Sequence, residues 1–493
     1  MNKQHISRIL RFKRCGMMFV QNLLANKRKG EIKEVMVTQP MIGKPKFVRE
    51  RAFYKSLFAL AVPVILQNIV VFLTQMLDTV MLGELGDVAM TASSLANQPF
   101  FIFNMLTFGL GSGAAVLTAQ YWGKKETEPI RIILTMIVRV TVLIGLLLTI
   151  VSLLIPEQLM MIFSPDPDVI REGASYMRIM CICYAFFGFS SSFYTTLRSV
   201  ETVKIAVASN VAALVVNGGL NYILIFGKFG FPALGVRGAA IATLCARLVE
   251  FLIAVIYMLF FDKKLKLCMR DFFRFDKQLC LDLIHISTPV VVNEVMWALG
   301  TSMQARLLGQ LGTQIVTANS IVSVVQQLAT VMVFGVAGAA AVLIGKAIGE
   351  GNMQEANDRG YTFKWLSVGV GVIVFGIILA LRSVAVDFYN VSAQAKSFAY
   401  DMMLVTSVVG FFISVSAVGI VGILRGGGDT KFSLNAEMFA LWAVAVPIAY
   451  FTAFVLHWPP ILVYCMIKLD EPVKNILIWI RLRGTRWLRD VTR

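Results

Sequence analysis

Residues 82–92 have the sequence LGELGDVAMTA, and residues 308–318, which follow 226 positions later, have the sequence LGQLGTQIVTA. The same shift aligns further residues without a gap, among them Pro63 with Pro289, Gly109 with Gly335 and Gly123 with Gly349. A second echo, shifted by 227 positions, relates LRSVETVK at 197–204 to LRGGGDTK at 424–431. Self-similarity at a fixed spacing indicates duplication. We therefore expect two copies of one structural unit.

The composition of the chain predicts a membrane protein. Of its 493 residues, 57% are hydrophobic and only 15% are charged, whereas soluble domains carry about 25% charged residues. Each helical crossing needs about 20 apolar residues, or about 35 to 45 with its loop, so the length allows about ten to fourteen crossings. A single-pass receptor and a peripheral enzyme are excluded.

Twelve apolar segments are predicted to cross the bilayer. They lie at residues 56–82, 93–120, 131–155, 171–196, 203–226, 238–261, 281–308, 317–345, 362–382, 397–424, 432–456 and 459–480. The last segment is interrupted by Lys468, Asp470 and Glu471, so we expect a short or partly interfacial final helix. The predicted fold class is an all-α membrane protein with twelve transmembrane helices in two six-helix lobes related by pseudo-two-fold symmetry.

The charge distribution predicts the orientation and four parts of the chain. These parts are a basic cytoplasmic N-terminal tail (1–50), an N-terminal lobe (51–262), a C-terminal lobe (263–480) and a basic cytoplasmic C-terminal tail (481–493). Residues 1–55 contain fourteen Lys or Arg and three Glu. The loops after the even-numbered segments are also basic, and we assign Arg198 and Arg425 to them. Basic residues accumulate on the cytoplasmic side, so both termini are expected there.

The duplication also predicts what the fold can do. Because each copy contains six crossings, both copies begin on the same side and form parallel repeats about an axis along the membrane normal. A cleft between two such lobes opens to each side in turn when one lobe rocks against the other, which is the geometry of a secondary transporter. The alternative is a duplicated helical bundle without transport, as in some channels or enzymes.

Several chemical functions are not expected. The seven cysteines form no CxxC pair, and three histidines are too few for a credible metal site. The chain has no G-x-S-x-G motif and no nucleotide-binding glycine loop, so we expect no enzymatic activity, no cofactor and a gradient as the energy source. The net charge of +17 is concentrated beside the membrane, so nucleic acid is not an expected partner.

Asp78 is the leading candidate for ion coupling. It lies in the outer half of the first crossing, and Asn217 and Asn221 lie on one face of the fifth crossing at a matching depth. The helical face of Asp78 also carries Gln67, Thr74 and Gln75. A carboxylate among amides in an apolar lobe suits a group that takes up and releases a proton. The alternative is a purely structural hydrogen-bond network.

Glu294, near the middle of the seventh crossing, is the second candidate, with Thr301 on its face and Trp297 one turn away. An acid beside an indole can bind an organic cation. The alternative is an acid that pairs with a buried arginine. Arg247 and Glu250 lie three residues apart and are expected to pair within their helix.

Four stretches resemble the multidrug and toxic compound extrusion (MATE) family, within a larger group that includes lipid-linked oligosaccharide flippases. They are LAVPVILQNIVVFLTQMLDTVMLGELG at 60–86, FGLGSGAAVLTAQYWGKKE at 108–126, LRSVETVKIAVASNVAALVVNGGLNYILIFG at 197–227 and VGILRGGGDTKF at 421–432. The resemblance covers about residues 51 to 493. It implies a twelve-helix antiporter that expels cationic drugs in exchange for protons or sodium ions.

The resemblance also implies roles for individual residues. Asp78, Asn217 and Asn221 occupy the places of the family's cation site in the N-terminal lobe. Some relatives carry an acid where Asn221 stands, and the acid that certain members carry deep in the tenth helix is absent here, since Asp401 lies near the outer end of that segment. Glu294 resembles the acid of the seventh helix in some members. These departures favour protons over sodium ions.

We therefore expect a monomeric, multi-pass protein of the bacterial inner membrane that exports amphipathic organic cations in exchange for protons. Asp78, Asn217 and Asn221 form the expected coupling site. The expected substrate cleft consists of Gln67, Thr74, Gln75, Glu294, Trp297 and Thr301. The first alternative is a flippase for a lipid-linked anionic precursor, which would need basic residues in the cleft. A membrane receptor or scaffold would need neither the duplicated lobes nor the buried acid.

Overall fold

The structure of the chain is a computed structural model that describes residues 42–389 and 391–492. Residues 45–493 form one compact unit, and this unit contains every helix of the described chain. Most of the expected N-terminal tail, residues 1–50, lies outside the described residues. The described part of the chain is helical and contains no strand, as the sequence predicts.

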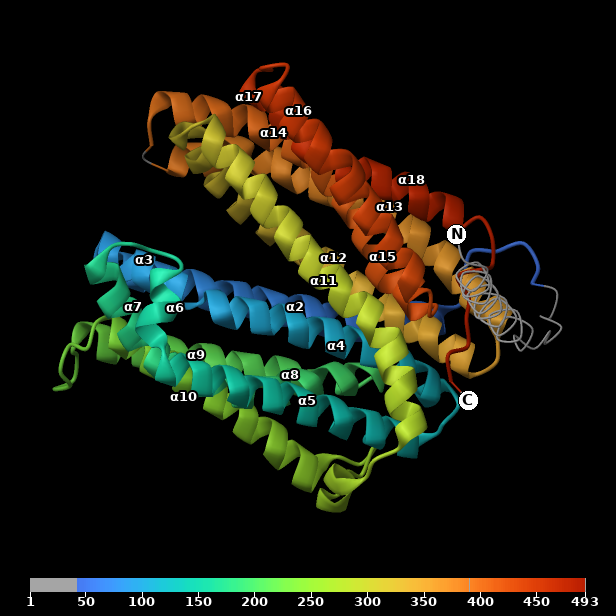
Figure 1. Cartoon of the computed structure of the whole chain (residues 1–493). Coiled ribbons are helices and arrows are strands. Elements are labelled where there is room, and N and C mark those ends of the chain that lie inside the picture. Colours follow the sequence, from blue (N-terminus) through green and yellow to red (C-terminus); the bar gives the residue numbers. More distant parts are fainter. Residues whose placement is uncertain (1–41, 390, 493) are drawn as a thin grey trace, which may run out of the picture. The chain divides into compact units, whose positions relative to one another are not determined.

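The first lobe consists of nine α-helices and a short π-helical extension, and together they make six crossings. Its elements are α2 (Arg51–Gly83), α3 (Asp87–Ala96), α4 (Gln98–Gly123), α5 (Thr127–Leu154), α6 (Pro156–Met161), α7 (Pro167–Met180), α8 (Cys183–Ser199), α9 (Lys204–Phe226), α10 (Val236–Ile256) and η1 (Tyr257–Phe261). In Figure 1 these helices run from blue to green. A linker with one turn of 3-10 helix, η2 (Met269–Phe273), leads to the second lobe.

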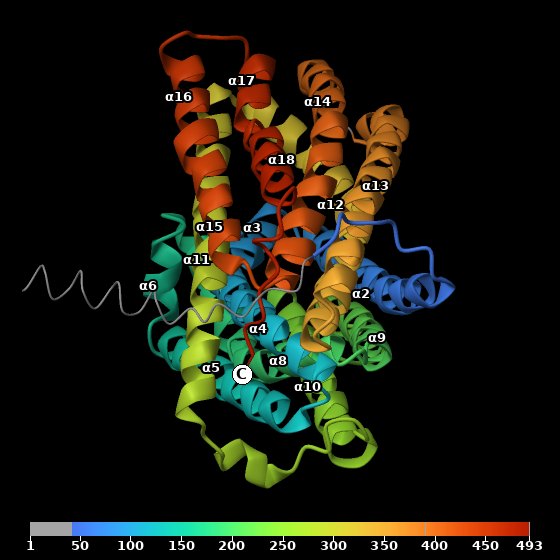
Figure 2. The same ribbon diagram turned by 90° about the vertical axis from the view of Figure 1, so that its right-hand side faces the viewer.

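The second lobe follows the same order. Its elements are α11 (Lys277–Leu311), α12 (Thr313–Gly349), α13 (Met353–Phe388), α14 (Ala393–Ala417), η3 (Val418–Leu424), α15 (Thr430–Met438), η4 (Phe439–Ala445), α16 (Val446–Phe454), α17 (Pro460–Ile467) and α18 (Asp470–Arg481). Here η3 and η4 are π-helical stretches within longer helices. Figure 2 shows α14 beside α13, and α17 between α16 and α14.

Ten helices in the described residues are long and apolar enough to cross a membrane, and the pair α7 and α8, bent by 53°, makes an eleventh crossing. The twelfth predicted segment is divided into α17 and α18 by a break at Lys468 and Leu469. Each of these two helices is too short to cross alone. The final crossing therefore consists of two short helices, in agreement with the expected short final helix. The charges at Asp470, Glu471 and Lys474 prevent one continuous apolar helix.

The packing repeats as the sequence does. In the first lobe α2 packs on α9, α4 on α5 and α5 on α8, and in the second lobe α11 packs on α15, α12 on α13 and α13 on α14. The contacts between the lobes also repeat: α4 packs on α11, and α12 packs on α2. Exchange of the two copies leaves this contact pattern unchanged, which is the behaviour of a pseudo-two-fold axis.

Glycines found by the sequence repeat lie where the lobes touch. A Cβ added at Gly109 of α4 would lie 2.9 Å from Cα of Val291, and one added at Gly335 of α12 would lie 2.4 Å from Cγ1 of Ile65. Val291 and Ile65 are themselves 226 positions apart. These contacts are therefore two copies of one close approach between helices, which only a residue without a side chain permits.

The closest approach between lobes is on the pseudo-two-fold axis itself. A Cβ added at Gly123 would lie 2.2 Å from the carbonyl oxygen of Lys346, and one added at Gly349 would lie 1.9 Å from the carbonyl oxygen of Gln120. Both glycines end their helices. The lobes therefore meet at this end, whereas they diverge toward the end that carries α3 and α16 (Figure 1).

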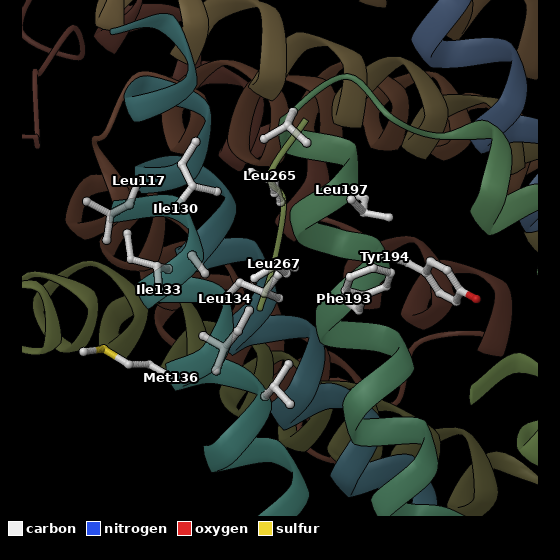
Figure 3. Close-up of a cluster of buried hydrophobic side chains, with 14 of the residues drawn as sticks. Leu117, Ile130, Ile133, Leu134, Met136, Phe193, Tyr194, Leu197, Leu265 and Leu267 are labelled. Carbon is white, nitrogen blue, oxygen red and sulfur yellow. The ribbon is translucent and has the colours of Figure 1, made fainter. Parts of the chain in front are cut away.

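Apolar side chains fill each lobe and cover its outside. A buried cluster in the first lobe joins α5 and α8, and Leu265 and Leu267 of the linker insert into it beside Leu134 and Phe193 (Figure 3). On the outer face of α5, Leu143 and Leu154 are exposed. Exposed leucines on a helix this apolar face the acyl chains of the bilayer.

The C-terminal segment packs against both lobes at the end where they meet. Gln120 of α4 donates to the carbonyl of Arg489 (3.0 Å) and accepts from the amide of Val491 (2.9 Å). On the other lobe, Asp429 pairs with Arg481 and Arg489. Trp487 is buried, where it contacts Gly360 and Gly427. The expected basic tail, 481–493, thus packs on the protein along its described length.

We predict that Gly349→Val drives the lobes apart at this end. The added Cβ overlaps a carbonyl oxygen, and that clash exceeds the few kcal/mol that separate the states of such a protein. Spin labels at Lys125 and Glu350, in a background without the seven cysteines, should show the closed population fall from dominant to minor. Gly376→Val is the control, because nothing lies within 4 Å of a Cβ there. An unchanged distance distribution would contradict the prediction.

We also predict that Trp487→Ala destabilises the protein by about 3 to 5 kcal/mol, the usual cost of removing a fully buried large aromatic side chain. Trp487 is 1% exposed, whereas Trp458, in the connection between α16 and α17, is 39% exposed. Thermal unfolding of detergent-solubilised protein should show a large decrease in Tm for Trp487→Ala and a small one for Trp458→Ala. Equal decreases in Tm for the two variants would contradict the prediction.

Candidate functional site

The structure brings the three predicted coupling residues together. Asp78 lies near the end of α2, and Asn217 and Asn221 lie one turn apart on α9, which packs on α2. The Nδ2 atom of Asn221 donates to Asp78 Oδ1 at 2.5 Å and to Asn217 Oδ1 at 3.2 Å. Both asparagines are fully buried, while Asp78 is partly buried. The carboxylate is therefore fixed by one amide that is itself fixed by another.

The hydrogen-bond network continues into neighbouring helices. Asn217 donates to Thr243 Oγ1 on α10 at 3.3 Å. The Oδ1 atom of Asn221 is buried and has no hydrogen-bond partner among the described residues. An acceptor without a donor beside a carboxylate suits a carboxyl group that gains a proton, because the protonated acid becomes a donor. Sequence reasoning missed Thr243, which gives no signal in an apolar helix.

Arg247 and Glu250 pair within α10, as expected, with an N–O distance of 2.8 Å. The guanidinium of Arg247 also lies over the rings of Phe100 and Phe187. Because Glu250 already balances Arg247, these two groups and Asp78 together carry one excess negative charge when all are ionised. Binding of one monovalent cation at Asp78 would neutralise this part of the lobe.

Two arginines lie at matching places between the lobes. Arg198 at the end of α8 donates to Gln67 of α2 at 3.4 Å, and Arg425 after η3 binds Glu294 of α11 at 2.8 Å. Each also reaches the opposite lobe: Arg198 lies 3.6 Å from a Cβ added at Gly338, and Arg425 donates to Ser112 at 3.3 Å. Ser112 and Gly338 are 226 positions apart.

This placement corrects the assignment of Arg198 and Arg425 to cytoplasmic loops. Arg425 is only 2% exposed, because α-helix and π-helix continue from α14 through η3 to Gly426 and leave the arginine inside the lobe interface. The shift of 227 positions already paired the two arginines. This repeat could have identified the two arginines as buried, because residues of a solvent-exposed loop are under no structural requirement to recur in both copies. For Glu294, the alternative of a buried ion pair is the one seen.

The other predicted cleft residues do not form one cluster with Asp78. Trp297 is partly exposed, Gln75 is exposed, and the hydroxyls of Thr74 and Thr301 bond to backbone carbonyls of their own helices. Within the described residues, no hydrogen bond or ion pair joins the Asp78 network to Glu294. The predicted residues therefore fall into two groups, one in each lobe.

A second buried charge network, missed by the sequence reasoning, lies beside Glu294 in the second lobe. Lys474 of α18 approaches Glu471 at 2.6 Å, Asp470 at 3.1 Å and Glu437 of α15 at 3.6 Å. Glu437 in turn accepts from Asn293 at 2.8 Å. Three carboxylates around one ammonium group hold the broken final crossing inside the lobe. Among the described residues no cluster of His, Cys, Asp or Glu is arranged to hold a metal ion.

Comparisons with known proteins agree with this architecture. The family model named MatE matches residues 63–223 and again residues 289–451, one match for each lobe. The probable multidrug resistance protein YoeA of Bacillus subtilis is 23% identical over 84% of this chain and 89% of its own length. The probable multidrug resistance protein NorM of Bradyrhizobium diazoefficiens is 29% identical over 85% of this chain and 90% of its own.

Solved structures show the same fold. A MATE protein crystallised in complex with MaL6 has a TM-score of 0.80 at 19% identity and covers 87% of this chain and 96% of its own. An outward-facing MATE transporter has a TM-score of 0.79 at 18% identity and covers 89% of this chain and 98% of its own. Since the MatE model matches most of both lobes, and since the curated relatives and the solved structures carry names of the same family, the chain belongs to the MATE family of multidrug efflux transporters.

Proposed function

We propose that this protein exports amphipathic organic cations in exchange for protons, by alternating access between its two lobes. The observation that carries the proposal is the contact of Asp78 with Asn221, held in turn by Asn217. An ionisable group within a transmembrane helix costs about 2.5 to 3.5 kcal/mol on insertion scales, so its presence needs a function. The network gives Asp78 partners in both protonation states.

The balance of charges supports a coupling role for Asp78. Arg247 is neutralised by Glu250, so Asp78 has no separate cationic partner among the described residues. A proton or a cationic cargo molecule supplies the missing charge, and each excludes the other on electrostatic grounds. Mutual exclusion at one carboxylate is the physical basis of exchange. A membrane potential contributes about 2.3 kcal/mol per charge per 100 mV to the transport.

The arrangement of the lobes supports alternating access. They are closed at the end that holds Gly123, Gly349 and the C-terminal segment, and Asp78 lies toward the other end. In the proposed orientation the closed end is cytoplasmic, with both termini there, so this state is open to the outside. Proton uptake by Asp78 then favours release of cargo, and deprotonation in the inward-open state resets the site.

The proposal extends to the setting of the protein. It acts as a monomer in the bacterial inner membrane and needs no cofactor besides the coupling ion. Protons are preferred to sodium ions because amides, rather than a second carboxylate, surround Asp78. Cargo contacts Gln67, Thr74, Gln75, Trp297 and Thr301 between the lobes.

A lipid-linked precursor flippase ranks second in this proposal. Such a protein needs unpaired basic groups to hold a pyrophosphate, and of the two arginines between the lobes Arg425 is neutralised by Glu294. Arg139 and Arg247, which lie within predicted crossings, are bound elsewhere: Arg139 to the Arg274 carbonyl and Arg247 to Glu250. Only Arg198 is left, which favours cationic cargo.

We predict that Asp78→Asn abolishes proton-coupled efflux. The amide keeps the hydrogen-bonding shape of the carboxyl group but cannot bind a proton, so ethidium transport in proteoliposomes under a pH gradient should fall to background. Glu84→Gln, an exposed acid beyond the end of α2, is the matched control and should transport normally. Undiminished efflux by Asp78→Asn, or efflux driven by a sodium gradient alone, would overturn the proposed coupling.

We predict that the Glu294 and Arg425 ion pair stabilises the folded protein mainly as a pair. Arg425→Gln alone leaves a buried carboxylate without a partner and should cost about 3 to 5 kcal/mol, whereas the double variant with Glu294→Gln should recover most of that loss. Thermal unfolding of the single and double variants gives the coupling energy. Additive losses of stability in the double variant would show that the two side chains act independently. Glu294 would then again be a candidate for cargo binding.

A further inference from the structure

The linker between the lobes and the adjacent helices form two neighbouring hollows. The first, of about 420 Å³, is almost entirely apolar and lies between α5 and α11, where Met136, Val140, Ile284 and Val292 line it. The second, of about 460 Å³, is polar and is lined by Arg131, Arg270, Arg274 and Asp271 together with Cys268 and Phe273. An apolar groove thus lies next to a basic pocket.

The two hollows adjoin through the chain at residues 274 and 275. Arg139, in the wall of the apolar groove, donates to the carbonyl oxygen of Arg274 at 2.7 Å, and Arg274 lines the basic pocket. Phe275, the next residue, lines the groove. Adjacent residues of the linker therefore line the two hollows.

The basic pocket has more positive charge than its acids balance. Asp271 lies 3.7 Å from Arg131 and 3.6 Å from Arg274, and Glu128 lies 2.9 Å from Arg274. Arg270 is exposed and has no ion-pair or hydrogen-bond partner among the described residues. The Nε atom of Arg131 is buried and also lacks a hydrogen-bond partner there. Guanidinium groups with free donors match the oxygens of a phosphate.

The pocket is rigid, which favours binding. Leu265 and Leu267 anchor the linker between α5 and α8 (Figure 3). Lys264 caps the end of α8 by donating to the carbonyls of Val200 (2.6 Å) and Glu201 (3.0 Å). Asp271 accepts from the amide of Cys268 at 3.0 Å. The backbone that carries Arg270 and Arg274 is therefore held in place before any ligand arrives.

We propose that an anionic phospholipid binds here, with an acyl chain in the groove between α5 and α11 and its phosphate at Arg270, Arg131 and Arg274. The groove opens on the lipid-facing side of α5 and α11, where Val140 and Ile284 are exposed. The other segment that could cover it, residues 1–41, is strongly basic and is repelled by the same arginines. Basic pockets at this membrane depth are the usual sites for anionic headgroups.

The test uses the full-length protein, purified in detergent and loaded with lipids of defined composition, followed by native mass spectrometry. Wild type is expected to retain one dioleoylphosphatidylglycerol after mild delipidation and no dioleoylphosphatidylcholine. Arg270→Gln is expected to weaken retention about fivefold, the factor that corresponds to about 1 kcal/mol per basic residue. Ile284→Trp changes no charge but fills the groove, and it is also expected to weaken retention.

Both variants alter exposed side chains, so folding should be preserved. The control is Arg483→Gln, an exposed arginine without an ion pair among the described residues, near the C-terminus; its lipid retention should equal that of wild type. Equal retention of the two lipids, or unchanged retention in both Arg270→Gln and Ile284→Trp, would overturn the proposal. Displacement of the lipid by millimolar inorganic phosphate would also overturn it, because the pocket would then be a site for soluble anions.

Discussion

The structure depends on one close contact, the crossing of α4 and α12 at Gly123 and Gly349. Each glycine lies against the backbone of the opposite lobe, and the contact lies on the pseudo-two-fold axis, so one steric requirement is met twice by the same duplicated residue. Because the two backbones are in contact, small shifts of the helices cannot be accommodated at these glycines. The lobes therefore either pivot about this contact or separate at it. The divergence of the lobes at the far end (Figure 1) and the docking of the C-terminal segment against both lobes accompany this closure.

The two lobes share one duplicated scaffold, but they differ in the positions of their ionisable residues. The residue 226 positions after Asp78 is Gln304, which donates to the carbonyl of Ile467 and carries no charge. Conversely, the residue 226 positions before Glu294 is Asn68, which carries no charge, whereas Glu294 binds Arg425. Each lobe has thus kept one acid on its first helix, at different depths. Under the proposed function, proton uptake by Asp78 alone would make the two lobes differ in charge, and that difference would bias a rocking motion between them.

Much of the fold and part of the site followed from local patterns. Asp78, Asn217 and Asn221 were found because helical spacing fixes both the face and the depth of a residue on a membrane helix. The pairing of Arg247 with Glu250 followed from the same spacing. The sequence predicted a weak final crossing, because charged residues at 470, 471 and 474 are costly inside the bilayer. It did not identify the residue outside this segment with which Lys474 pairs. That partner, Glu437, is on another helix, and periodicity within one helix contains no information about contacts with a distant one.

The sequence by itself determined that the chain spans a membrane, that it consists of two parallel copies and that an acid with amide neighbours lies in the first. Those conclusions rest on the transfer free energy of side chains and on helical geometry, which are local properties. Only the tertiary structure decided that Arg425 is buried against Glu294, that residues 481–492 pack across both lobes and that arginines of the linker border an apolar groove. These depend on which helix ends meet in space, and short-range patterns cannot specify that when the contacts join residues far apart in the chain.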